Sequence, residues 1–127
     1  MDKNRSRVYV VDDDDSVRRA FGRLLRSAGL DAETFSSAEE FFSSAKQDKN
    51  ACILIDIRMP GLSGFDLLER LASQGIQIPV IVVSAFDDAK IREHARELGA
   101  IPFFRKPVDD QALLDAIWWA ISGGRKE

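Results

Sequence analysis

Five short apolar runs, separated by longer segments with helical periodicity, limit the folds open to this chain of 127 residues. The runs cover residues 8–11, 32–35, 52–55, 80–83 and 101–104. The runs at 8–11, 52–55 and 80–83 are almost continuous aliphatic stretches, which is typical of parallel strands buried on both faces of a sheet. The run at 32–35 is weaker and more polar, so we expect it at an edge.

The segments between and after the runs have apolar residues at the spacing of amphipathic helices, over residues 16–28, 37–46, 64–73, 87–98 and 109–122. Five strand–helix repeats predict an α/β fold with a doubly wound, flavodoxin-like parallel sheet. We expect five strands in the order 2-1-3-4-5, flanked by five helices. A single domain should occupy residues 1–122, and residues 123–127 should form a tail or the start of a linker.

Composition narrows the possible functions. The net charge is −3 and the pI is about 5.2, so the overall electrostatics favour neither nucleic acid nor an anionic membrane. No apolar stretch approaches the roughly 20 residues of a membrane span. The single cysteine, Cys52, lies inside an apolar run and is expected to be a buried thiol. We therefore expect a cytoplasmic protein whose domain contacts neither nucleic acid nor a membrane.

Four consecutive aspartates follow the first apolar run directly, at residues 12–15. Neighbouring carboxylates repel one another where water is partly excluded, so at the end of a buried strand they need a counter-charge such as a divalent cation. The alternative is a solvated acidic turn that caps the next helix. We assign Asp12 and Asp13 to a binding site, and Asp14 and Asp15 to the start of the helix, where carboxylates favour the positive end of the helix dipole.

Polar side chains also follow three later strands. Ligands of open parallel sheets bind beyond the carboxyl ends of the strands, so the residues at four of these ends should lie together: Asp12, Asp13, Asp56, Ser84 and Lys106. Each alone has an ordinary explanation as a cap or a surface charge. Together they suit phosphoryl transfer, because a carboxylate can act as nucleophile, oxygen ligands hold a hard cation, and an ammonium binds phosphate.

Six short motifs accompany these residues: VVDDD at 10–14, IDIRMP at 55–60, GLSG at 61–64, SA at 84–85, GA at 99–100 and FFRKP at 103–107. Over almost the whole chain, they resemble the receiver domains of two-component response regulators. The stretch at 56–64 is most similar to the FixJ subgroup. Regulators of that subgroup usually carry a LuxR-type helix-turn-helix output domain after the receiver.

The resemblance implies a role in phosphorylation for four residues. Asp56 would be the phosphoacceptor, Lys106 would contact the phosphoryl group, and Ser84 would turn toward that group once it is present. Phe103 occupies the position of the family's aromatic switch residue and would change rotamer with Ser84. The peptide bond between Lys106 and Pro107 is expected to be cis.

The resemblance also implies a cofactor and its ligands. Asp12, Asp13 and Asp56 would bind Mg²⁺, for which Mn²⁺ can substitute, together with the backbone carbonyl of Arg58. The chain would then be a signalling switch rather than an enzyme, since the only reactions expected of it are its own phosphorylation and its own slow dephosphorylation.

The expected partners follow from the same resemblance. A sensor histidine kinase would donate the phosphoryl group, and phosphorylation would alter the face formed by residues 87–98, 101–104 and 109–122. Two copies would dimerise through this face and so control an output domain, with DNA bound by a helix-turn-helix domain absent from this chain. Within the last helix, we expect Trp118 in the core and Trp119 partly exposed, because adjacent helical positions point about 100° apart.

Two alternatives remain open from the sequence. Asp12 and Asp14 after an apolar strand also resemble the haloacid-dehalogenase type of Mg²⁺-dependent phosphohydrolase, in which Asp12 would be the nucleophile. That class needs room for a cap, which this chain lacks, and it leaves Asp56 without a role. The second alternative is a phosphorylation-independent, receiver-like binding module. Such modules typically lack one of the five key residues, and all five positions are filled here.

Overall fold

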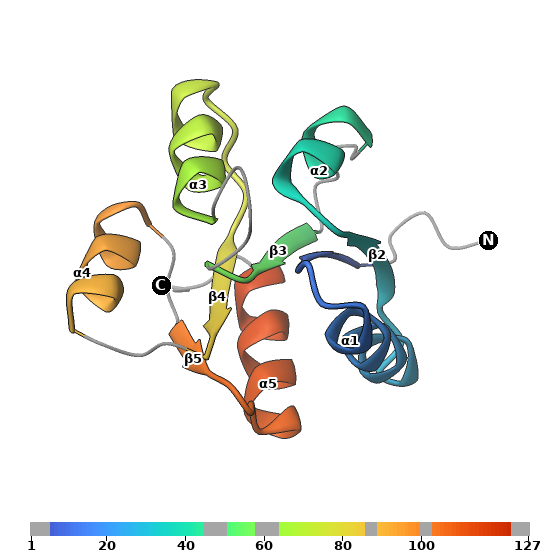
Figure 1. The fold of residues 1–127 in the computed structure, drawn as a ribbon. Coiled ribbons are helices and arrows are strands. Elements are labelled where there is room, and N and C mark those ends of the chain that lie inside the picture. Colours follow the sequence, from blue (N-terminus) through green and yellow to red (C-terminus); the bar gives the residue numbers. More distant parts are fainter. Residues whose placement is uncertain (1–5, 45–50, 58–63, 86–88, 100–102, 123–127) are drawn as a thin grey trace.

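Five parallel strands form one sheet in the order β2-β1-β3-β4-β5 (Figure 1). The computed structural model describes residues 6–44, 51–57, 64–85, 89–99 and 103–122. The strands are β1 (Arg7–Val11), β2 (Asp31–Phe35), β3 (Ala51–Ile55), β4 (Val80–Ser84) and β5 (Phe103–Arg105). The predicted strand order is confirmed, and so is the edge position of the more polar run at 32–35.

Helices cover both faces of the sheet, as a doubly wound fold requires (Figure 1). They are α1 (Asp15–Ser27), α2 (Ala38–Ser44), α3 (Gly64–Ser73), α4 (Ala89–Glu97) and α5 (Asp110–Ile121). Helices α1 and α5 pack on one face, and α2, α3 and α4 on the other. Wherever the described residues allow comparison, the predicted helix ends lie within one residue of the observed ends.

The strand side chains divide between two apolar layers because successive residues of a strand point to opposite faces. In β1, Val8 and Val10 pack toward α1 and α5, whereas Tyr9 and Val11 pack toward the other three helices. Strands β3 and β4 divide in the same way and are buried throughout. The sheet is thus held from both sides, and its carboxyl edge forms a fixed platform.

The turn between β1 and α1 is capped by Asp14. Its Oδ1 accepts hydrogen bonds from the backbone N–H groups of Ser16 at 2.8 Å and Val17 at 3.2 Å. Such a cap stabilises a helix by about 1 kcal/mol. Asp15 follows in the first turn and forms an ion pair with Arg18. The division of the acidic run is therefore confirmed for its second half.

Helix α5 departs from expectation at Trp118, which is 43% exposed rather than part of the core. Its buried line consists of Leu113, Ile117 and Ala120, and Trp118 is rotated away from that line, so the large ring reaches past the edge of the core. Trp119 is 51% exposed, as predicted. The helix therefore presents two indole rings to solvent in different directions.

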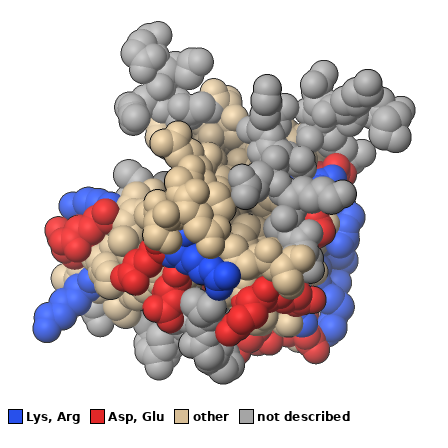
Figure 2. Space-filling view, turned by 90° about the horizontal axis from the view of Figure 1, so that it is seen from above, with Lys and Arg blue, Asp and Glu red and all other residues tan. Residues whose placement is uncertain are grey.

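Other expectations from composition can be compared with the described residues. Cys52 is buried, and burial raises the pKa of its thiol to about 12, so the thiol stays protonated at neutral pH. None of the described helices is long and apolar enough to cross a bilayer. Basic and acidic side chains are interspersed on the face drawn in Figure 2, near its centre as well as at its sides, so this face presents no single field of positive charge.

Candidate functional site

The two carboxylates that follow β1 and β3 are placed side by side by the sheet itself. Val11 pairs with Ile55 in the register of these strands, so Asp12 and Asp56 each come one residue later at the same edge. The Asp56 N–H donates to the Val11 carbonyl at 3.0 Å, and the Asp12 N–H donates to the Phe35 carbonyl at 3.1 Å. These bonds extend the backbone ladder beyond the strands and fix where both side chains begin.

Three carboxylates meet at this edge. One oxygen each of Asp12, Asp13 and Asp56 lies within 4.8 Å of the other two. Asp12 and Asp56 are buried, whereas Asp13 is exposed, so the group opens to solvent on one side. This donor set fits Mg²⁺, which is usually held by a few carboxylates and completes its octahedron with water. Arg58, whose carbonyl is the fourth expected ligand, lies outside the described residues.

Lys106, which directly follows the edge strand β5, binds two of these carboxylates. Its Nζ donates to Asp12 Oδ2 at 3.0 Å and to Asp56 Oδ2 at 3.3 Å. Burial alone would lower the Lys106 pKa, but the hydrogen bond and charge of Asp12, and then those of Asp56, outweigh burial and raise it. The backbone positions the side chain through the Lys106 N–H, which donates to the Ser84 carbonyl at 2.8 Å. The peptide bond to Pro107 is cis, as predicted.

The raised pKa of Lys106 predicts how the stability of the domain depends on pH. The ion pairs stabilise the folded state fully below the unfolded-state pKa of about 10.4, and this contribution is lost as the pH rises through the raised folded-state pKa. In EDTA at pH 8, Lys106→Met should lower the free energy of unfolding by about 2 kcal/mol, less than for a fully buried pair because the ammonium is partly exposed.

Denaturant unfolding from pH 8 to pH 11.5 measures this effect, with Lys90→Met on exposed α4 as the matched control. The difference in the free energy of unfolding between the wild-type protein and Lys106→Met should shrink at the alkaline end of this range. A difference that stays constant across this range would contradict the ion-pair explanation.

Ser84 ends β4 at the same edge and is fully buried. It pairs with Arg105 in the register between β4 and β5, which sets it beside the strand that leads to Lys106. Phe103 opens β5 opposite Val82. The structure describes the backbone of Phe103 at the predicted switch position, and its side chain lies outside the described part of the chain.

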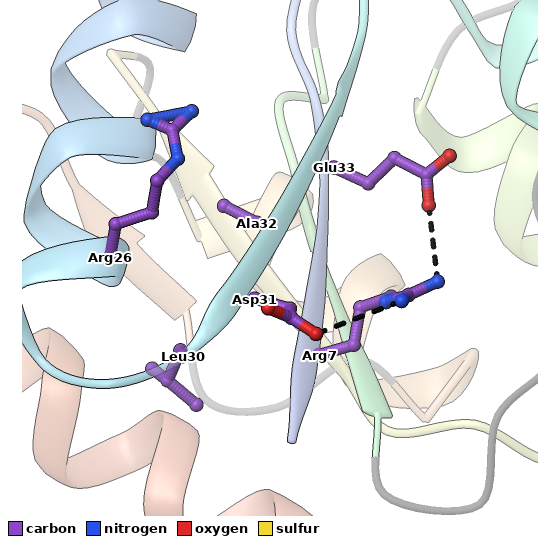
Figure 3. Close-up of a pocket in the computed structure, with 6 residues that line it drawn as sticks. All are labelled: Arg7, Arg26, Leu30, Asp31, Ala32 and Glu33. Atoms are coloured by element: carbon purple, nitrogen blue, oxygen red, sulfur yellow. Dashed lines mark hydrogen bonds and ion pairs between the residues drawn. The ribbon is translucent and has the colours of Figure 1, made fainter. Parts of the chain in front are cut away.

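A hollow of about 430 Å³ lies elsewhere on the domain, beside the edge strand β2 (Figure 3). Its lining comprises Arg7, Arg26, Leu30, Asp31, Ala32 and Glu33. Arg7 and Asp31 are the first residues of their strands, so the hollow is at the amino edge of the sheet. Arg7 pairs with Asp31 at 3.7 Å and with Glu33 at 3.4 Å, which offsets the local charge. The cluster at the carboxyl edge is the better candidate site.

Comparison with known proteins decides the family. The model of the response regulator receiver domain family matches residues 8–118. This chain is a response regulator receiver domain. The receiver domains of such regulators are signalling domains of two-component systems, and the resemblance inferred from the six motifs is thereby confirmed.

Individual relatives agree with this assignment. The receiver domain is 42% identical over 119 residues to Nodulation protein W of Bradyrhizobium diazoefficiens, covering 94% of this chain and 52% of that protein. The structure of the response regulator StyR has a TM-score of 0.86 at 42% identity and is matched over 93% of this chain and 60% of StyR. FixJ-N has a TM-score of 0.85 at 31% identity over the full length of both chains. The chain spans about half the length of the curated relatives it matches.

Two contacts at the site were not foreseen from the sequence. Gly64, the first residue of α3, packs directly against the backbone at Asp56 and Ile57. Arg18 donates to the backbone carbonyl of Asp12 at 2.6 Å. The Gly64 contact had a visible signal, since a glycine at the start of a helix permits close approach of two backbones. The Arg18 contact had none, because α1 places several arginines on its surface.

Proposed function

We propose that this receiver domain is a phosphorylation-activated switch in which Asp56 accepts a phosphoryl group from the phosphohistidine of a sensor histidine kinase. One observation carries the proposal: Asp12, Asp13 and Asp56 converge at one edge, and Lys106 bridges two of them. With all side chains ionised, three carboxylates against one ammonium leave two negative charges uncompensated. A single divalent cation carries the charge that balances them.

Each residue of the site has its own role in the proposed transfer. An Asp56 oxygen would attack phosphorus, the P–N bond of phosphohistidine would break, and its electron pair would stay on the imidazole. Lys106 would follow the phosphoryl oxygens as a point charge, and the Ser84 hydroxyl would donate to one of them. Mg²⁺, held by Asp12, Asp13 and Asp56, would neutralise charge on the transferring group. Mn²⁺, also a hard divalent cation, could substitute.

Mapping the phosphoryl group tests the assignment. The domain should be incubated with acetyl phosphate and Mg²⁺, trapped by borohydride reduction and analysed by peptide mass spectrometry. We expect the label on Asp56, and none when EDTA replaces Mg²⁺, because removal of the cation leaves the incoming phosphate facing three carboxylates. A label on Asp12 instead would support the phosphohydrolase alternative.

The arrangement of the whole regulator belongs to the same proposal. We assign residues 1–122 to the receiver and residues 123–127 to a tail or the start of a linker. Relatives about twice as long include the transcriptional regulatory protein TdiR of Thauera aromatica. We therefore infer an output in transcription, through a LuxR-type domain that binds DNA. The signal would pass from Ser84 and Phe103 to the face formed by α4, β5 and α5, in the cytoplasm and without enzymatic turnover of a diffusible substrate.

Dimerisation through this face is the proposed consequence of phosphorylation. Helix α4 has Ala95 as its only buried residue among those described, and such thin packing suits an element that shifts. Trp119, exposed on α5, would supply an interface anchor. In Mg²⁺ and beryllofluoride, Trp119→Ala should weaken the dimer about 30-fold, as expected when an interface tryptophan is truncated at a cost of about 2 kcal/mol.

Sedimentation velocity over a concentration series measures this dimer. Trp118→Ala is the matched control, because that indole is similarly exposed but points in a different direction. A beryllofluoride complex that stays monomeric at high concentration would rule out the dimer. A dimer that Trp119→Ala leaves unweakened would place the interface elsewhere, and equal weakening by both substitutions would show that Trp119 is not a specific anchor.

A further inference from the structure

The turn that carries Asp13 is held at both of its ends. On one side, Arg18 Nη1 donates to the Asp12 carbonyl at 2.6 Å. On the other side, the Asp14 N–H donates to the Asp12 carboxylate at 3.0 Å. Asp13 lies between these contacts, and it is the one exposed member of the carboxylate cluster. Its own side chain has little packing to orient it, so the backbone of the turn must set its direction.

The contacts of Arg18 hold this turn in one conformation. The same guanidinium that binds the Asp12 carbonyl also pairs with the Asp15 carboxylate. The Arg18 N–H donates to the Asp14 carbonyl at 3.0 Å, which fixes the residue in the first turns of α1. Only 18% of the side chain is exposed. The planar fork of arginine can bind two oxygens at once, whereas a lysine ammonium is a compact point charge.

We propose that Arg18 is a positioning residue for the metal site: its guanidinium ties the end of β1 to the first turn of α1 and so keeps the Asp13 carboxylate within reach of the cation held by Asp12 and Asp56. This inference rests on the proposed function, because it requires Asp13 to be a metal ligand. In this proposal Arg18 acts through the backbone of the turn and is neither a metal ligand nor a contact of the phosphoryl group.

The charge of Arg18 and its positioning role act in opposite directions on cation binding. A positive guanidinium near the site repels a divalent cation, so its removal by electrostatics alone would tighten binding. Loss of the contact to the Asp12 carbonyl would free the turn and weaken binding. Residues that orient metal ligands typically contribute 10- to 100-fold to affinity, and we expect about tenfold here because Arg18 acts through the backbone.

The test is binding of Mn²⁺ alone, with the free ion counted by electron paramagnetic resonance at a temperature well below unfolding. Arg18→Lys should raise the dissociation constant about tenfold, since it keeps the charge but loses the two-pronged contact. Arg18→Met should raise the dissociation constant by less, because removal of the repelling charge offsets part of the loss. Arg19 is the next residue of α1 and is exposed, so Arg19→Met should leave the dissociation constant within about twofold of the wild-type value. Arg18→Lys keeps the charge and serves as the second variant if Arg18→Met folds poorly.

A double-mutant cycle identifies the residue through which Arg18 acts. In an Asp13→Asn background, Arg18→Met should change Mn²⁺ affinity by less than about twofold, because coupled residues are not additive. Tighter binding by Arg18→Met, wild-type binding by Arg18→Lys, or full additivity with Asp13→Asn would each overturn the inference. A wild-type domain that binds no Mn²⁺ would overturn the proposed metal site as well, which separates the two failures.

Discussion

Replacing Asp12 and Asp13 together by asparagine is expected to slow Mg²⁺-dependent phosphorylation of Asp56 by at least about 100-fold. Two of the three carboxylates that converge at the site would lose their charge, while the fold of the turn could still form through amide oxygens. A metal ion that neutralises developing charge contributes several kcal/mol to such a transfer, and about 2.7 kcal/mol corresponds to 100-fold in rate. The loss should be seen in the rate of label incorporation from acetyl phosphate.

Asp15→Asn is the control that tests whether Asp15 belongs to the start of α1 and not to the site. Asp15 carries the same charge three residues from Asp12, but it is exposed and pairs with Arg18 within the first turns of α1. Its replacement should lower the free energy of unfolding by about 0.5 kcal/mol, as for other exposed helical pairs. The phosphorylation rate should stay within about twofold, because Arg18 keeps its contact to the Asp12 carbonyl and the asparagine oxygen can still accept from the guanidinium. If Asp15→Asn slowed phosphorylation more than the double replacement did, the run would have been divided at the wrong residue.

Gly64→Ala should destabilise the domain by about 3 kcal/mol, the upper end of the usual cost of overpacking. A Cβ at this position would lie 2.7 Å from Ile57 Cα and 2.8 Å from the Asp56 carbonyl oxygen. Both are backbone atoms, and the Gly64 N–H already donates to the Ile57 carbonyl at 3.0 Å. Relief of the clash must therefore displace the peptide that carries Asp56, the proposed phosphoacceptor, so phosphorylation should fall together with stability.

Gly75→Ala separates crowding from backbone strain. Gly75 has φ of 70°, and nothing lies within 4 Å of a Cβ placed there. Its replacement should cost about 1 kcal/mol, from the left-handed backbone alone, and should leave phosphorylation unchanged. Denaturant unfolding of both variants measures the difference. Equal costs at the two positions would show that the contact at Gly64 is not tight enough to matter.

The sheet could be predicted from the sequence because its signals are periodic and local. Buried strands show as continuous apolar runs, and the aspartates that follow β1 and β3 must share an edge once the strand order is known. The exposure of Trp118 could not be predicted in the same way, because its helical position lies at the margin of the core and the size of the ring decides how much protrudes. The hydrogen bond from Arg18 to the Asp12 carbonyl depends on the shape of one turn, and the shape of a turn leaves no periodic pattern in the sequence.

The bridge from Lys106 to Asp12 and Asp56 has a consequence for a cell that runs short of divalent cations. The ammonium already partly compensates the clustered carboxylates, so the domain has its own internal substitute for a metal. A bound cation would add to the charge compensation that Lys106 already supplies, and folding is not expected to depend on it. The receiver domain is therefore expected to stay folded when divalent cations are scarce, and to need only their return before it can be phosphorylated again.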